Sequence, residues 1–236
     1  MITPAQSSSI PAVILFGSPD SGKGTQARLL QKCLKGPHIS TGDMLRSHIQ
    51  AGDSIGRHAQ TLIKSGRLVP DEMVNQLVQE RLQASDCQAG IILDGYPRTT
   101  NQAEVLLTFM RGFGYRAAVV YLMVDYDKIV ARLSGRRQCP VCGTLYSMTT
   151  NPPKVAGICD LDGAKLVTRE DDRESVIRER LNAYELQTRP LLDFFRQAGV
   201  PMLEINAADT SPEQISQEIC RSLRSVGLML TASGSR

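Results

Sequence analysis

The residues best suited to chemistry form a glycine-rich turn, Gly17-Ser18-Pro19-Asp20-Ser21-Gly22-Lys23-Gly24-Thr25. An apolar run at residues 12–16 precedes it, and a helical pattern at about residues 26–34 follows. A turn of this kind directs successive backbone N–H groups at one point, and the helix N-terminus adds partial positive charge. We therefore predict a phosphate cradle over residues 20–25, with the Lys23 ammonium on the β- and γ-phosphates of a nucleotide.

The residue after Lys23 departs from the general pattern of such turns. That position usually holds a Ser or Thr whose hydroxyl binds the magnesium ion of the nucleotide, but here it is Gly24. Two possibilities stay open. Either Thr25 supplies the hydroxyl, or the magnesium is held mainly through water molecules and other residues.

Four arginines form a second pattern suited to phosphate. Arg132 and Arg136 lie four residues apart in a predicted helix, which would place both guanidinium groups on one face. Arg169 follows a cysteine-rich stretch that starts after Arg136, and Arg180 lies in a long helix predicted over residues 173–195. The planar fork of arginine suits bidentate contact with phosphate oxygens.

Three of the six cysteines have a spacing typical of a metal site. Cys139 and Cys142 form a CxxC pair, and Cys159 with Asp162 repeats that spacing. Three thiolates and one carboxylate complete the tetrahedral shell of a structural Zn²⁺ site. The repeat favours Asp162 over Asp160, and unliganded reduced thiols are the alternative. The other cysteines are predicted to be isolated buried side chains: Cys33, Cys87 and Cys220.

The elements that must position these residues are short apolar runs alternating with helical patterns. Candidate strands cover residues 12–16, 38–40, 90–93, 117–124 and 201–205. Most read as continuous apolar runs, typical of parallel strands covered on both faces, so we predict an α/β fold with a doubly wound parallel five-stranded sheet in three layers.

Two stretches interrupt this alternation and are predicted to be insertions in a single domain. Residues 40–69 read as helical, and residues 135–172 are rich in Gly, Pro, Cys and charge. The predicted core then comprises residues 10–39, 70–134 and 173–224, and residues 225–236 form a frayed tail.

Composition excludes several classes of partner. The 236 residues are 42% hydrophobic and 22% charged, with a net charge of only +3, too small to indicate nucleic acid or an anionic membrane as the main partner. No run approaches the roughly 20 apolar residues of a membrane span, and the start has no signal-peptide pattern. We expect a cytoplasmic protein.

Several sequence blocks together resemble the adenylate kinase family. After the strand and phosphate turn come Ser40-Thr41-Gly42-Asp43-Met44-Leu45-Arg46, Gly66-Arg67-Leu68-Val69-Pro70-Asp71-Glu72 and Leu93-Asp94-Gly95-Tyr96-Pro97-Arg98-Thr99 with Gln102, then Arg132, Arg136, Arg169, Asp171, Asp172 and Arg180. They keep family order over roughly residues 12–195. The resemblance is to members with a long, zinc-binding lid, and it implies the nucleoside monophosphate kinase fold and phosphoryl transfer between MgATP and AMP.

The resemblance also implies roles for individual residues. The AMP site would comprise Thr41, Arg46, Arg67, Leu68, Val69, Gly95, Tyr96, Pro97, Arg98, Gln102, Arg169 and Arg180. The ATP site would add Arg136, Leu145 and Tyr146 to residues 20–25, with Tyr146 against the adenine. Direct in-line transfer would be supported by Lys23, Arg98, Arg132, Arg136, Arg169 and Arg180, with Asp94 ordering the waters around magnesium. The cofactors would be Mg²⁺ with ATP and a structural Zn²⁺, in a monomer whose insertions move and whose opening limits turnover.

One residue departs from the family pattern, and it leaves alternatives open. Asp20 stands where the family almost always has Gly, and a carboxylate there is predicted to weaken ATP binding unless it faces solvent or caps a local N–H. The alternatives are a UMP/CMP kinase, a GTP-dependent AMP kinase, or a catalytically weak nucleotide-binding or zinc-ribbon module. The long cysteine-containing lid and Thr41 favour AMP.

Overall fold

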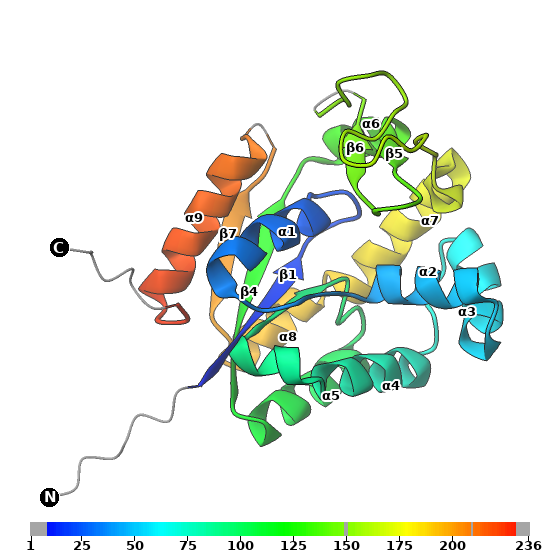
Figure 1. The fold of residues 1–236 in the computed structure, drawn as a ribbon. Helices are drawn as coiled ribbons and strands as arrows, with labels where there is room; N and C mark the ends of the chain where they lie inside the picture. The colour runs from blue at the N-terminus through cyan, green and yellow to red at the C-terminus, as the bar shows by residue number, and fades with distance from the viewer. Residues whose placement is uncertain (1–8, 149–150, 209, 230–236) are drawn as a thin grey trace, which may run out of the picture.

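The computed structural model describes residues 9–148, 151–208 and 210–229 and confirms the predicted five-stranded parallel sheet. Its strands are β1 (Ile10–Phe16), β2 (His38–Ser40), β3 (Ile91–Asp94), β4 (Tyr115–Met123) and β7 (Met202–Asn206), in the order β2-β3-β1-β4-β7 (Figure 1). Leu15 pairs with Asp94 and Phe16 with Tyr121. The carboxyl ends of β1 and β3 are therefore neighbours, which is where ligands bind in open α/β sheets.

Helices cover both faces of the sheet and make the three predicted layers. On one face, α1 (Lys23–Leu34) and α9 (Pro212–Ser225) bury side chains such as Leu30 and Ile219 against Val13. On the other face, α4 (Asp71–Leu82), α5 (Thr100–Gly112) and α8 (Leu191–Gln197) pack on the side chains of β1 that point the opposite way. Burying one such Leu, Ile or Phe side chain contributes roughly 1.5–3 kcal/mol, so the alternating side chains of each strand fasten it to both helical layers.

The long helix predicted over residues 173–195 is interrupted. It consists of α7 (Glu174–Ala183), a π-helical turn η3 (Tyr184–Thr188) and α8. Pro190 precedes α8 and has no N–H to donate to the preceding turn, while the Arg189 N–H bonds to the Tyr184 carbonyl at 2.8 Å. The Thr188 hydroxyl donates to the Arg98 carbonyl at 3.0 Å, so the wide turn also supports the cavity described below.

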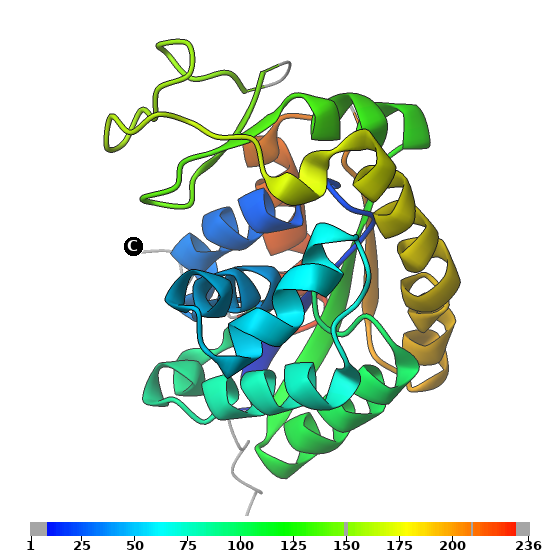
Figure 2. The same ribbon diagram turned by 90° about the vertical axis from the view of Figure 1, so that its right-hand side faces the viewer.

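Two segments project from this core, as Figures 1 and 2 show. The first contains α2 (Thr41–Ala51) and α3 (Ser54–Lys64), whose first turns are capped by the side chains of Ser40 and Asp53. The second follows α6 (Tyr126–Ser134) and contains the antiparallel pair β5 (Arg136–Gln138) and β6 (Leu145–Ser147), ending in η2 (Glu170–Asp172). We call this second segment the lid.

The described part of the predicted frayed tail is packed. Leu228 is buried in the cluster under α9, and Arg116 donates to the carbonyls of Val226 and Gly227 at 2.7 and 3.1 Å. The predicted tail also includes residues 230–236, which lie outside the described residues. A short 3₁₀ turn, η1 (Ser85–Ala89), joins α4 to β3. None of the helices in the described ranges is long and apolar enough to cross a bilayer.

Candidate active site

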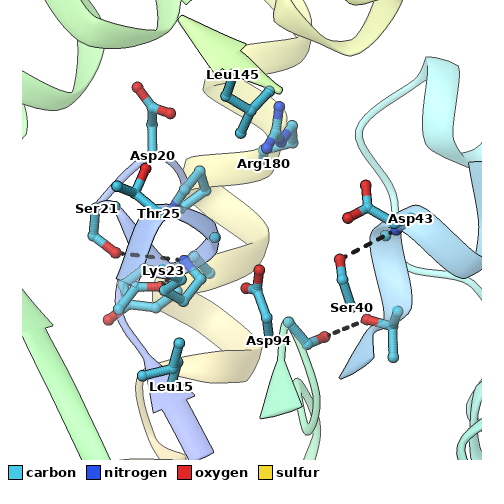
Figure 3. Close-up of a pocket in the computed structure, with 18 of the residues that line it drawn as sticks. Leu15, Asp20, Ser21, Lys23, Thr25, Ser40, Asp43, Asp94, Leu145 and Arg180 are labelled. Atoms are coloured by element: carbon cyan, nitrogen blue, oxygen red, sulfur yellow. Dashed lines mark hydrogen bonds between the residues drawn. The ribbon is translucent and has the colours of Figure 1, made fainter. Parts of the chain in front are cut away.

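A cavity of about 360 Å³ lies between the carboxyl ends of the central strands, the α2–α3 pair and the lid, and Figure 3 shows part of its wall. Nearly all of the residues that the sequence pointed to line it. They are Asp20, Ser21, Gly22, Lys23, Gly24, Thr25, Thr41, Arg46, Arg67, Leu68, Val69, Asp94, Gly95, Pro97, Arg98, Gln102, Arg132, Arg136, Leu145, Tyr146, Arg169 and Arg180. The structure thus brings together two sequence-distant groups, the glycine-rich turn and the arginines.

The glycine-rich turn closes tightly at the end of β1. Gly17 has a φ of 144°, and a Cβ there would lie 2.7 Å from the Leu122 carbonyl oxygen, so only glycine fits. The Lys23 ammonium donates to the carbonyls of Gly17 and Ser18 at 2.8 and 2.7 Å. Burial under the turn lowers the pKa of Lys23 to about 8, although the nearby Asp94 carboxylate opposes the shift.

The Gly24 position lies close to a carboxylate at the end of β3. A Cβ on Gly24 would lie 3.3 Å from Oδ2 of Asp94, so a larger residue would crowd that carboxylate. Burial alone would raise the pKa of Asp94, but the hydrogen bond from His38 at 3.2 Å and the Lys23 charge outweigh it and hold the pKa below its ordinary value. Asp94 is therefore a carboxylate facing the turn, while Thr25 is exposed beside it (Figure 3).

The base of the lid carries a network of arginines and aspartates. Arg136 donates from Nε and Nη2 to both carboxylate oxygens of Asp172, and from Nη1 to Asp20 at 2.9 Å. Arg180 donates to the Asp171 carbonyl at 3.0 Å and to the Asp172 carboxylate at 3.1 Å, and it lies 3.1 Å from the Asp171 carboxylate. Burial opposes the charge on Arg136, but the bonds to Asp172 and the charge of Asp20 prevail and raise its pKa.

Other cations in the cavity lack such compensation. Burial, with the neighbouring Arg180 charge, lowers the pKa of Arg98 to about 10. Burial, with the charges of Arg46 and Arg136, lowers the pKa of Arg169 to about 9. In this cavity, burial and mutual repulsion disfavour the charged forms of the cations. A polyanionic ligand would fit it well, because added negative charge would offset the cost of burying them.

The wall formed by α2 and β3 has the geometry of a second anion site. Arg98 donates from Nε to the Gly95 carbonyl at 2.8 Å, and the Thr41 hydroxyl donates to the same carbonyl at 2.8 Å. Arg46 bonds to Asp43 through Nη2 at 2.6 Å, while its buried Nε has no hydrogen-bond partner among the described residues. Two guanidinium groups thus face the cavity opposite the glycine-rich turn.

Three predictions about individual side chains need correction or restriction. Arg132 and Arg136 do not share a helix face, because α6 ends at Ser134 and Arg136 begins β5. Arg132 instead donates to the carbonyls of Ala207 and Ala208 at 3.1 and 2.9 Å. Tyr96 does not line the cavity: it is 1% exposed and its hydroxyl donates to Asn75 at 2.6 Å.

The Tyr146 side chain belongs mainly to the lid interior. Its hydroxyl accepts from the Asp160 N–H at 2.7 Å and contacts the Cys159 sulfur at 3.4 Å, and only 5% of the residue is exposed. It still lines the cavity. Any contact with an adenine is therefore limited to the small exposed part of the ring, and the predicted contact remains a prediction.

The cysteine spacing produces two matching turns in the lid. The Gly143 N–H bonds to the Cys139 carbonyl at 3.1 Å, and the Gly163 N–H to the Cys159 carbonyl at 3.0 Å. One ligand atom from each of four residues lies within 4.8 Å of the others: Cys139, Cys142, Cys159 and Asp162. Asp160 instead bonds to the Lys154 N–H at 2.9 Å. This donor set fits a tetrahedral zinc ion.

Four side chains beside the site were assigned no role from sequence. His38 orients Asp94, Asp172 and Asp171 engage the lid arginines, and Asp43 lies 3.9 Å from Arg169 as well as bonding Arg46. His38 and Asp94 are 56 positions apart, so no local spacing in the sequence indicates their pairing. The three aspartates lie in the blocks already noted, and Asp43 precedes Arg46 by three residues, a spacing that favours an ion pair on a helix.

Comparison with known proteins agrees with this geometry. A family model described as adenylate kinase matches residues 15–200. A protein named adenylate kinase from Moorella thermoacetica is 47% identical over 204 residues, covering 86% of this chain and 94% of its own length. Proteins of the same name from Trichlorobacter lovleyi and Oceanobacillus iheyensis are 48% and 46% identical, and cover 80% and 79% of this chain and 88% and 87% of their own lengths. The glycine-rich turn, the two facing groups of arginines and these matches lead to one conclusion: the chain belongs to the adenylate kinase family.

Proposed function

We propose that this chain transfers the terminal phosphoryl group of MgATP reversibly to AMP, giving two ADP. The observation that carries the proposal is the placement of the glycine-rich turn and two groups of arginines around a single cavity. The acceptor oxygens of a nucleoside monophosphate are largely ionised at neutral pH, since the second phosphate pKa is about 6. No general base is then needed, and the barrier lies in bringing two polyanions into line.

Residues at different positions in the cavity would bind different parts of the two substrates. Backbone N–H groups of residues 20–25 and the Lys23 ammonium would hold the donor phosphates, while Arg46 and Arg98 would hold the phosphate of AMP. Arg136, Arg169 and Arg180 line the same cavity and would neutralise charge on the transferred phosphoryl, whose oxygens carry it in the transition state. Asp94 would order the waters around the magnesium that arrives with ATP, and Thr25 would supply a hydroxyl.

The cysteine cluster would hold a structural zinc ion. Cys139, Cys142, Cys159 and Asp162 supply four ligand atoms, so no coordination position is left for a substrate. The lid's own apolar cluster is small, comprising Cys139, Tyr146, Cys159 and Leu166 with Ala164 beside them. A zinc ion would stabilise the segment in place of a larger core.

Residues 40–69 and 135–172 would act as two moving covers on one kinase domain that works as a cytoplasmic monomer. Closure excludes water, which competes with AMP for the phosphoryl group. Opening is then the step that limits turnover, and a burst of ADP that exceeds the steady-state rate would be observed after rapid mixing. Equal single-turnover and steady-state rates would contradict this.

A coupled assay tests the proposal. ADP formation is measured with MgATP or MgGTP as donor and AMP, UMP, CMP or GMP as acceptor. The expected result is the highest kcat/KM for ATP with AMP. Preference for UMP or CMP, or for GTP as donor, would identify one of the alternative kinases, and no product with any pair would indicate a binding module.

A further inference from the structure

The phosphate turn carries a negative charge that is bound to the lid. Asp20 has a φ of 60° in the left-handed region, and its carboxylate lies on the Leu145 side of the turn, away from Lys23 (Figure 3). Its Oδ1 accepts a hydrogen bond from Nη1 of Arg136 at 2.9 Å. The Arg136 side chain is 7% exposed and that of Asp20 is 18% exposed, so the ion pair is largely screened from water.

Asp20 uses the end of Arg136 that Asp172 leaves available. Asp172 engages Nε and Nη2 of the guanidinium, and its own side chain is completely buried. Nη1 points across to the phosphate turn, where the donor triphosphate would lie. A carboxylate oxygen and a phosphate oxygen are alternative acceptors for the same N–H group, because both carry negative charge.

We propose that Asp20 is an internal competitor of the donor triphosphate for Arg136. This inference rests on the proposed function of the cavity. The Asp20 carboxylate stands in for a phosphate oxygen and holds the lid base against the phosphate turn. Donor binding must break this ion pair and bring the triphosphate close to a like charge, so this chain binds its donor more weakly than a chain without the carboxylate. Asp20 thereby sets donor affinity through Arg136, while the acceptor side is unaffected.

Binding measurements on variants of the full-length protein test the proposal. The probe is the magnesium complex of the non-hydrolysable β,γ-imido analogue of ATP, measured by titration calorimetry. Asp20→Asn keeps the size of the side chain and removes its charge, and Asp20→Gly removes the side chain. Both are expected to lower the donor Kd roughly tenfold, the value of one partly buried charged contact. The Kd for AMP should stay within about twofold.

Two controls separate competition from other effects. Glu218→Gln changes the net charge by the same amount on the exposed face of α9 and should leave the donor Kd unchanged. In an Arg136→Gln background, which binds the donor more weakly, Asp20→Asn should gain less than about threefold, because the contact at stake has gone. Thermal unfolding monitored by circular dichroism establishes that each variant is folded.

The outcomes are distinct. Weaker or unchanged donor binding in Asp20→Asn would overturn the proposal, and weaker binding would instead indicate that the carboxylate helps to hold the magnesium. A tenfold gain that persists in the Arg136→Gln background would show general repulsion rather than competition for Arg136. If the unmodified chain is an active kinase, each of these binding results leaves the proposed function intact. The absence of any activity in the unmodified chain would overturn the proposed function itself.

Discussion

At the scale of single residues, the cavity contains one arginine bonded to two carboxylates and other cations that make no hydrogen bond to a carboxylate among the described residues. Arg136 is held by two carboxylates and its pKa is raised, whereas burial lowers the pKa of Lys23, Arg98 and Arg169. For Lys23, the charges of Asp94 and Asp20 raise the pKa and those of Arg98 and Arg180 lower it. The groups with lowered pKa values are the ones that a phosphate would stabilise most, because each gains a counter-charge it lacks.

Donor binding should therefore depend on pH through Lys23. Its pKa of about 8 lies well below that of a free lysine, and the triphosphate prefers the protonated form. Affinity is fully present below pH 8 and should fall by up to tenfold per pH unit above it, until the raised pKa of the bound state is reached. Above about pH 7.5 the phosphates, whose second pKa is about 6, are almost fully ionised and contribute little to this fall. Titration calorimetry between pH 6.5 and 9.5 measures the effect.

The matched control for this dependence is Lys23→Arg. Arginine keeps its charge to a higher pH than lysine, so the variant should bind more weakly and lose the fall in affinity that begins near pH 8. The same slope in the variant would show that another group titrates.

Gly95 illustrates how closely the acceptor side is packed. Its φ is 76°, and a Cβ there would lie 2.9 Å from Nη2 of Arg98 and 3.2 Å from the Thr41 hydroxyl. Gly95→Ala should therefore displace Arg98 and raise the KM for AMP roughly tenfold, through strain of about 1–2 kcal/mol. The KM for ATP should change little. Gly112→Ala is the matched control, because a Cβ there meets nothing within 4 Å; an unchanged KM for AMP in Gly95→Ala would show that Arg98 moves freely.

At the scale of elements, the features that could be predicted from the sequence are those determined by residues close together in the chain. The five strands were predicted within about two residues because they are apolar runs bounded by turns, and the glycine-rich turn was recognisable because its residue types are demanded by its geometry. The break at η3 was missed because the helical pattern continues through it. The fate of Arg132 was missed for a different reason: its partners, the carbonyls after β7, are 75 and 76 residues away. Local spacing carries no information on such contacts.

The lid turns allow a sharp test of the metal ligands. Asp162 lies among the cysteine sulfurs, with Oδ2 3.1 Å from that of Cys139, whereas Asp160 bonds to the Lys154 N–H. Asp162→Ala should weaken zinc binding on the order of 100-fold and lower the thermal stability of the lid, because one ligand is lost. Asp160→Ala should keep one zinc per chain. Metal content after dialysis against a weak chelator gives the answer, and equal retention in both variants would exclude Asp162 as a ligand.

At the scale of the whole molecule, two helices from opposite ends of the described sequence lie side by side, α1 and α9. Helix α9 packs beside α1 on one face of the sheet (Figure 1). This contact brings together Cys33 and Cys220, which the sequence spacing predicts to be isolated. Their sulfurs lie 2.6 Å apart, and both are free thiols. Cys33 is partly exposed and Cys220 is buried, so a small reagent can reach the pair from one side.

A low-molecular-weight disulfide should therefore cross-link the two helices. Exchange would convert the thiols of Cys33 and Cys220 and one molecule of reagent into one protein disulfide and two molecules of reagent thiol. Because the bond would close a loop spanning 187 positions, it should restrict the unfolded chain and raise the melting temperature by roughly 5–15 °C. Activity should be retained, since Cys33 is separated from Lys23 by most of α1, roughly 15 Å along its axis.

Intact mass under denaturing conditions would reveal the loss of two hydrogens, and dithiothreitol should reverse both the mass change and the stabilisation. Cys220→Ser provides the control and should show neither; a mixed disulfide on Cys33 in the unmodified chain, without closure, would show that the helices hold the two sulfurs too far apart to react.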